Sequence, residues 1–159
     1  MAYYSRNEHS DSNWRNESQK VVLSASTGGA GPLPVITTLL AAPLNVVSTG
    51  IDVSEFSRPN VLLTFTGIVN LPLGISVTLN FQIVRATDDG ATPVGSTYTF
   101  ATLVNVLESE AFSFQFFDVN LEPDSYTYTV QLSTNSIIDI TPGLTITNAT
   151  LSALAVDQD

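Results

Sequence analysis

Short runs in which apolar and polar residues alternate recur along this chain, and they constrain its fold more than any other feature. Every second residue is apolar over 77–83, 112–116 and 126–132. A period of two places the apolar side chains on one face of a β-strand. Turn signals separate such runs: Thr87-Asp88-Asp89-Gly90, Glu122-Pro123-Asp124 and Pro142-Gly143. The pattern predicts a protein built from strands joined by turns.

The number and spacing of these runs predict the architecture. Eight or nine strand segments follow one another, and no segment has a convincing helical period. Such a chain is typical of an all-β domain, and we predict a jelly-roll-like β-sandwich. Within 144–156 the apolar phase shifts near Asn148, which indicates a β-bulge. The predicted organisation is an N-terminal extended arm with a strand candidate over 1–27, a Gly/Pro hinge over 28–34 and the sandwich over 35–159.

The chain is acidic, and the charge is unevenly distributed. Fifteen Asp and Glu face five Lys and Arg, so the net charge is -10 and the pI about 4.1. Residues 1–20 contain three charges of each sign, which leaves the whole net charge in the remainder. Nucleic acid and anionic membranes favour basic partners, so both are disfavoured here. The acidity is interpreted either as an ordinary solvated surface or as a body that a neutral arm approaches without repulsion.

Features that would assign a compartment are missing. The chain has no cysteine, which excludes disulfides and thiolate chemistry. The N-terminus shows no apolar stretch of a signal peptide, and no run approaches the length of a membrane span. We expect no membrane insertion. The expected location is a surface or the extracellular space, reached without a recognisable signal peptide; the alternatives are that the protein stays inside the cell or that a leader was removed before this numbering.

The residue types on which most catalytic and metal sites depend are almost absent. His9 is the single histidine and lies in the polar arm, which disfavours a Ser-His-Asp triad or a transition-metal site. The glycine-rich segment 28–31 lacks the Lys-Ser/Thr ending of a phosphate loop. Two acidic pairs are interpreted as solvated strand and turn residues rather than a glycosidase pair or a calcium site: Glu108 with Glu110, and Asp88 with Asp89. We expect no enzyme activity, no cofactor and no metal.

The N-terminal segment carries the most informative signal of function. In residues 20–40, "KVVLSASTGGAGPLPVITTLL", a short strand candidate precedes a glycine-rich spacer and a proline pair. The strand could fold back onto its own sheet, stay in solvent, or pair with the sheet edge of a neighbouring subunit. The third alternative gains main-chain hydrogen bonds, and repeated head-to-tail contacts of this kind build rings or filaments.

The third alternative, pairing with a neighbouring subunit, predicts which residues make the contact. We predict that the inserted strand contacts a neighbour through one apolar group, that aromatic residues in the polar arm act as anchors, and that glycines supply a hinge. These three sets are Val21, Val22 and Leu23; Tyr3, Tyr4 and Trp14; and Gly28, Gly29 and Gly31.

Several stretches also resemble a known family. They are "NVVSTGIDVSEFSRPNVLLTF", "LNFQIVRATDDGATPVGSTYTF", "FSFQFF", "YTYTVQL" and "ITNATLSALAV", which span about 45–156. They resemble short β-rich, spore-associated proteins of spore-forming Firmicutes, catalogued as a domain of unknown function. The resemblance implies a spore-associated protein and no catalytic residues. Family members carry cysteines after "FSF", and this chain has none there, so a disulfide role does not transfer.

The arm followed by a sandwich is also similar in layout to subunits of bacterial endospore appendages. We therefore expect a structural subunit that assembles with itself into a spore-surface fibre through its arm, in contact with other spore-surface proteins. One alternative is a carbohydrate- or ligand-binding module that uses exposed tyrosines, namely Tyr98, Tyr126 or Tyr128. A further alternative is a closed trimer of jelly rolls in a spore coat or exosporium layer.

Overall fold

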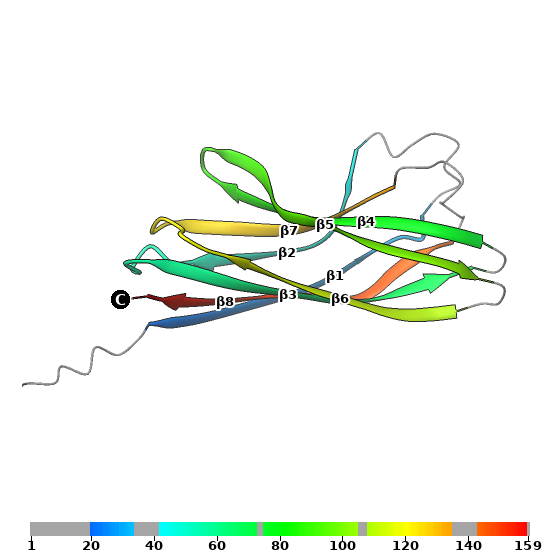
Figure 1. The fold of residues 1–159 in the computed structure, drawn as a ribbon, viewed down its shortest axis with the longest axis horizontal. Coiled ribbons are helices and arrows are strands. Elements are labelled where there is room, and N and C mark those ends of the chain that lie inside the picture. The colour runs from blue at the N-terminus through cyan, green and yellow to red at the C-terminus, as the bar shows by residue number, and fades with distance from the viewer. Residues whose placement is uncertain (1–19, 34–41, 73–74, 105–107, 135–142, 159) are drawn as a thin grey trace, which may run out of the picture.

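Eight strands make up the part of the chain that the structure describes. The computed structural model describes residues 20–33, 42–72, 75–104, 108–134 and 143–158. The strands are β1 (Val21–Ala30), β2 (Leu44–Asp52), β3 (Pro59–Leu71), β4 (Ile75–Thr87), β5 (Gly90–Val104), β6 (Glu108–Asp118), β7 (Ser125–Ser133) and β8 (Thr145–Asp157). They form two four-stranded antiparallel sheets packed face to face (Figure 1). The predicted all-β sandwich is confirmed.

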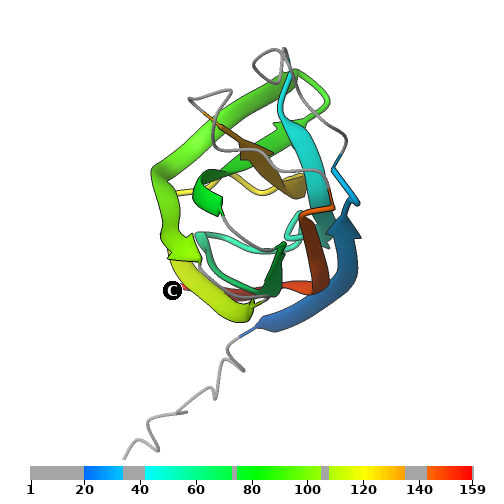
Figure 2. The same cartoon turned by 90° about the vertical axis from the view of Figure 1, so that its right-hand side faces the viewer.

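The strand order is that of a jelly roll. The first sheet has the order β1-β8-β3-β6 and the second the order β2-β7-β4-β5. Only β4 and β5 are consecutive strands paired as a hairpin; the other connections cross between the sheets. Viewed end-on, β1 lies beside β2 on one side of the sandwich, and β5 lies beside β6 on the other (Figure 2). We call these two lines of approach the β1–β2 seam and the β5–β6 seam.

The core lies between the sheets and follows from the alternation of apolar residues. The inward side chains of β3, β4 and β7 include Phe65, Phe81 and Tyr128, each at most 1% exposed. Burying an aromatic or aliphatic side chain of this size contributes about 1.5–3 kcal/mol to folding. No buried side-chain nitrogen or oxygen among the described residues lacks a hydrogen bond.

The predicted bulge in the last strand is confirmed. Asn148 has a left-handed φ of 51°, and the register of β8 shifts there against both neighbours, β1 and β3. The shift lets Ile146 and Ala149 both face the core although they are three residues apart. The bulge therefore keeps the inner face apolar through the phase change seen in the sequence.

The structure differs from the predicted domain organisation at residues 21–33. Residues 21–30 form β1 of the sandwich, and Gly28 and Gly29 lie inside this strand, with Gly28 opposite Ala149 of β8. The pairing continues to Leu33, whose backbone N–H donates to the carbonyl of Leu144 at 2.8 Å. Leu33 is buried in the core. In the described part of the chain, the end of β1 and the bonded Leu33 thus lie where a hinge is predicted; Pro34 lies outside the described residues.

Close approach of backbones explains why glycine occupies these positions. A Cβ atom on Gly28 would lie 2.3 Å from the carbonyl oxygen of Val46 on β2, and one on Gly29 would lie 2.6 Å from the carbonyl oxygen of Ile146. Gly31 has a φ of 106°, which is strained for any residue with a side chain. These glycines therefore allow β1 to pack closely against two neighbouring strands, which accounts for the sequence "GGAG" without a hinge.

Candidate interaction surface

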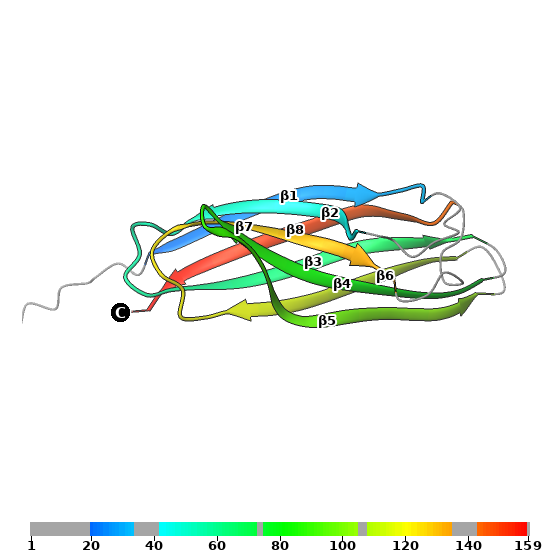
Figure 3. The same ribbon diagram turned by 90° about the horizontal axis from the view of Figure 1, so that it is seen from above.

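The predicted contact residues fall into two groups. Tyr3, Tyr4 and Trp14, and with them His9, lie outside the described residues. Val21, Val22 and Leu23 begin β1, which pairs with β8 of the same chain along its whole length (Figure 3). A single chain therefore folds this strand back onto its own sheet. The contact between subunits stays a prediction.

Strand β1 is held at the edge of the sandwich and buries little. None of its ten residues is buried. Val21 is 56% exposed and Leu23 is 68% exposed, and both point away from the core, since Ser24 and Ser26 face the neighbouring strand β2. An edge strand with exposed apolar side chains is a ready pairing or packing surface.

Leu23 is one end of an apolar row that crosses the whole outer face of the first sheet. The register places Leu23 opposite Leu154, Leu154 opposite Leu62, and Leu62 opposite Phe117. Phe117 is 54% exposed, and Leu154 and Leu62 are half-buried. We call these four residues the apolar row. Val21 and Val156 form a second apolar pair beside it.

The sequence analysis missed three residues of this row. The sequence did contain a signal for them, because each is an apolar residue at a position where the alternation of its strand calls for a polar one. Phe117 directly follows Phe116, and Leu62 and Leu154 stand between apolar neighbours. Those residues could be recognised as outward-facing only once the inward phase of each strand was known. Their common position depends on the pairing of four strands that are distant in sequence.

The rest of this outer face is uncharged. The next two rows across the four strands consist of small, hydroxyl and amide residues: Ala25, Ser152, Thr64 and Gln115, then Thr27, Thr150, Thr66 and Ser113. None of these side chains carries a charge, although the chain as a whole has a net charge of -10. A second molecule can approach this face without meeting a like charge on it.

Charged groups lie at the end of the first sheet, beyond the apolar row. The carboxylate of Asp157 accepts hydrogen bonds from the backbone N–H groups of Arg58 and Ser57 at 2.8–3.0 Å. These bonds, the one from Arg58 first, lower the pKa of Asp157. The Lys20 ammonium donates to the carbonyl of Glu55, and the Lys20 carbonyl accepts from the Asp157 N–H at 3.0 Å. The start of β1 is thereby fixed to the end of β8.

The outer face of the second sheet has a polar row in place of the apolar one. The Gln131 side-chain amide donates to the oxygen of Asn45 at 3.0 Å, and Gln131 stands opposite Gln82. The Gln82 amide oxygen accepts from the Thr97 hydroxyl at 3.1 Å. These side-chain bonds join β2 to β7 and β4 to β5, and the Gln82 amide nitrogen donates to the backbone carbonyls of Ile83 and Val94. The row presents no apolar anchor.

The tyrosines considered for carbohydrate stacking are not exposed platforms. Tyr126 is 6% exposed and Tyr128 is fully buried. The Tyr98 ring stacks on Phe114 with centroids 4.0 Å apart, and its hydroxyl donates to the Gln115 carbonyl. The expectation of an exposed tyrosine face is therefore wrong, because alternation on β7 and β5 turns all three rings inward.

Among the described residues, a partly buried ion pair between Arg85 of β4 and Asp118 of β6 links the two sheets. The Arg85 guanidinium lies 3.0 Å from the Asp118 carboxylate, which also accepts a hydrogen bond from the Tyr128 hydroxyl at 2.9 Å. Burial, and next the charge of Asp118, raise the pKa of Tyr128, so this phenol stays protonated and donates. Arg85 also lies 5.6 Å from the ring centroid of Tyr126. Arg85 and Asp118 therefore neutralise each other's charge, and Asp118 also accepts the hydrogen bond of Tyr128.

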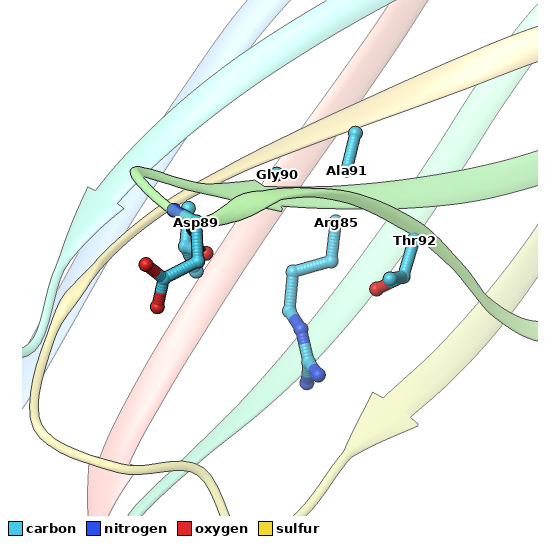
Figure 4. A pocket seen from close by; sticks show the side chains of 6 residues that line it. Arg85, Asp89, Gly90, Ala91 and Thr92 are labelled. Carbon is cyan, nitrogen blue, oxygen red and sulfur yellow. Dashed lines mark hydrogen bonds between the residues drawn. The ribbon is translucent and has the colours of Figure 1, made fainter.

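A shallow pocket of about 320 Å³ lies on the β4–β5 hairpin (Figure 4). Its lining residues are Arg85, Thr87, Asp89, Gly90, Ala91 and Thr92. The guanidinium that lines it is already paired with Asp118. The pocket therefore offers no unpaired positive charge to a ligand, and the other charged group in its lining is the exposed carboxylate of Asp89.

The two acidic pairs of the sequence analysis lie on the surface and are not joined by further metal-binding side chains in the described part of the chain. Glu108 and Glu110 are exposed at the start of β6, and Asp88 and Asp89 are exposed at the β4–β5 turn. Within the described ranges, no group of three or more His, Cys, Asp or Glu side chains is placed to hold a metal ion. The same residues include no helix long and apolar enough to cross a membrane.

The strand order of the two sheets defines a β-sandwich domain of the jelly-roll class. The chain belongs to the family DUF4489, described as a domain of unknown function, whose model matches residues 19–156. The predicted membership in a family of unknown function is confirmed; an association with spores is not part of that description. No curated protein matches this chain.

The solved structures to which this chain is similar include much longer chains. Two are structures of infectious bursal disease virus. The structure of the Gx strain has a TM-score of 0.46 at 10% sequence identity, and the match covers 89% of this chain and 32% of that chain. The structure of the Gt strain has a TM-score of 0.45 at 11% sequence identity, and the match covers 89% of this chain and 38% of that chain. The enzymatically active domain of bacteriophage CBA120 tailspike protein 4 has a TM-score of 0.32 at 15% identity, covering 82% of this chain and 19% of that one.

Proposed function

We propose that this protein is a structural subunit that assembles with copies of itself through its N-terminal arm, forming a fibre or appendage at a bacterial spore surface. The observation that carries the self-assembly is the exposure of Val21 and Leu23 at the start of β1, where the arm joins the sandwich. The placement at a spore surface comes from the sequence resemblance described above.

Contact with another copy would remove apolar surface from water. Full burial of a Val or Leu side chain contributes about 1.5–3 kcal/mol, and Val21 and Leu23 are more than half exposed in the single chain. One such contact is weak once the cost of association is subtracted. A head-to-tail contact repeats along a polymer, however, and each subunit in the interior makes it twice.

The distribution of charge supports the same conclusion. Copies with a net charge of -10 repel one another, and this repulsion is screened beyond about 8–10 Å in physiological salt. The outer face of the first sheet carries no charge on its three central rows, so it is a surface on which two copies can touch.

The test replaces the exposed apolar residues at the root of the arm in the full-length chain. In Val21→Ser/Leu23→Ser the strand and its backbone pairing with β8 are retained, because both side chains are exposed. The matched control is Ile68→Ser, a half-buried residue at the other end of the same sheet, opposite Ala111 and Thr147. Negative-stain microscopy and light scattering measure the assembly of all three proteins.

We expect filaments or large multimers of the wild type and of Ile68→Ser, and monomers of the double variant. Assembly of the double variant at the wild-type level would contradict the proposal, as would a monomeric wild type. A sharp particle mass of three chains for the wild type would replace the fibre by a closed trimer.

A further inference from the structure

Within the part of the chain that the structure describes, Leu23 and Phe117 at the two ends of the apolar row stay exposed, and the position of the row suggests an occupant. We propose that the apolar row of one subunit receives the aromatic side chains of the N-terminal arm of a neighbouring copy, with Trp14 as the main anchor. This inference rests on the proposed function, because it names the surface that receives the arm.

The row has the shape of a site for an extended segment that carries large side chains. It runs across four paired strands, so its length is about 14 Å at the usual spacing of strands. Leu23 and Phe117 stand exposed at its two ends, with half-buried Leu154 and Leu62 between them. A ring laid across Leu154 and Leu62 would contact both end residues.

The arm has the composition of the missing partner. Its 19 residues before Lys20 are mostly polar, and its large apolar groups are Tyr3, Tyr4 and Trp14, besides Met1. Two basic and three acidic residues leave it nearly neutral, which suits an uncharged face. Aromatic side chains bury much area at a low cost in conformational entropy, and they dominate many protein interfaces.

The reach of the arm allows contact with a neighbour. The arm joins the sandwich at Lys20, next to Val21 and the end of the row. Trp14 precedes Lys20 by six residues, which extend over about 20 Å at most. Tyr3 and Tyr4 lie further out along the chain, at up to about 60 Å. A neighbour must therefore present its row near the root of this arm.

The chain at Lys20 favours a neighbour over the same subunit. Lys20 is fixed at both its carbonyl and its ammonium group, and the backbone there still follows the direction of β1. To return to its own sheet, the arm would have to reverse within residues 15–19, a stretch of five residues whose only common turn formers are Asn16 and Ser18. A neighbour placed ahead of β1 is reached without such a reversal. The contact is heterologous, because the arm and the row are different surfaces.

The absence of cysteine allows a clean crosslinking test on the full chain. One protein carries Asn13→Cys, which keeps Trp14, and a second, of a different size through an added tag, carries Gln115→Cys. Gln115 is exposed and faces outward on β6 in the row beside Phe117. The matched control acceptor is Ala111→Cys, also exposed and outward on β6 but four residues further from the row. The proteins are mixed under assembly conditions and mildly oxidised.

We expect the adduct of Asn13→Cys with Gln115→Cys to exceed the adduct with Ala111→Cys by about fivefold or more, because docking raises the local thiol concentration. Adding Leu62→Ser to the acceptor should abolish the excess, and adding Ile68→Ser should not. In parallel, fluorescence of the single tryptophan should shift to shorter wavelength on assembly, and Leu62→Ser should reduce the shift.

The contrary results separate the inference from the proposed function. Filaments that form without an excess of the Gln115→Cys adduct would overturn the inference and leave self-assembly intact. An intrachain bond in the double variant Asn13→Cys/Gln115→Cys, in place of the adduct between copies, would show that the arm covers its own row and would likewise overturn it. A monomeric wild type would overturn both.

Discussion

The two seams of the sandwich bring the same two sheets together by opposite means. At the β5–β6 seam, aromatic rings fill the space: Tyr98 stacks on Phe114, and Phe100 meets Phe112 edge-on. At the β1–β2 seam the backbones approach closely, with Gly28 against Val46 and small hydroxyl groups of Ser24 and Ser26 bonded to Thr49.

The difference shows that the two sides of the sandwich are not held together equally. The β5–β6 seam is the strongly closed side, because buried rings join the sheets there, and the β1–β2 seam is the weakly closed side, because β1 has no buried side chain. Aromatic rings bury a large apolar area and anchor β6 in the core. Strand β1 brings no buried side chain, so it is held by backbone pairing with β8, by hydroxyl bonds and by close packing. The weakly closed side is the one that carries the root of the arm, and we expect small changes there to alter β1 without unfolding the rest of the sandwich.

The largest expected effect is on the aromatic seam. Phe114 is 9% exposed and packs on both Tyr98 and Phe65, so Phe114→Ala should lower the free energy of unfolding by about 3–5 kcal/mol. Urea denaturation measures it. The matched control is Phe117→Ala on the same strand, where the ring is exposed and about 1 kcal/mol or less is expected. Equal losses of unfolding free energy in Phe114→Ala and Phe117→Ala would show that the buried rings do not hold the β5–β6 seam more firmly than an exposed ring does.

A smaller effect is expected at the close-packed seam. Gly28→Ala places a Cβ 2.3 Å from the Val46 carbonyl, and the strands must separate, at a cost of about 1–3 kcal/mol. Gly50→Ala on β2 is the control, since its Cβ would meet nothing closer than 3.9 Å. Faster amide hydrogen exchange confined to β1 and β2 would sharpen the comparison. A tolerated Gly28→Ala with unchanged exchange would instead favour a flexible hinge at this glycine.

The hydroxyl bonds of the same seam should contribute less. Thr49 is 2% exposed, and its hydroxyl bonds both Ser24 and Ser26, at 3.1 and 3.2 Å. Thr49→Val keeps the shape and removes these bonds, so a loss of about 1 kcal/mol is expected. Thermal unfolding beside Thr27→Val, an exposed position on β1, provides the reference. A loss as large as that of Phe114→Ala would show that hydroxyl bonds close this side as firmly as rings close the other.

The smallest effect depends on pH and concerns the end of β8 that holds Lys20. The folded pKa of Asp157 is lowered by the N–H groups of Arg58 and Ser57, so its stabilising effect is complete above the unfolded value of about 3.9 and is lost as the pH falls through the folded value. Between about pH 5 and pH 2 the wild type should therefore lose more stability than Asp157→Asn. Parallel urea midpoints would show it, and identical pH profiles would contradict it.

Much of the fold follows from local sequence. Alternation on 77–83 and 126–132 predicts β4 and β7, because a period of two permits only a strand with one buried face. The phase change at Asn148 predicts the bulge, and the scarcity of helical periods predicts the all-β class. The interpretation of "GGAG" as a hinge did not anticipate the position of Val46, because no local pattern reports which backbone lies opposite.

The sequence by itself determined most of the strands, which side chains share a face within one strand, the acidic charge and the aromatic groups of the arm, since each of these depends on neighbours along the chain. Only the tertiary structure decided that β1 pairs with β8, that Tyr126 and Tyr128 turn inward, and that four strands align an apolar row. Alternation predicts which residues share a face of one strand. The register between strands that are distant in sequence determines which residues of different strands lie side by side.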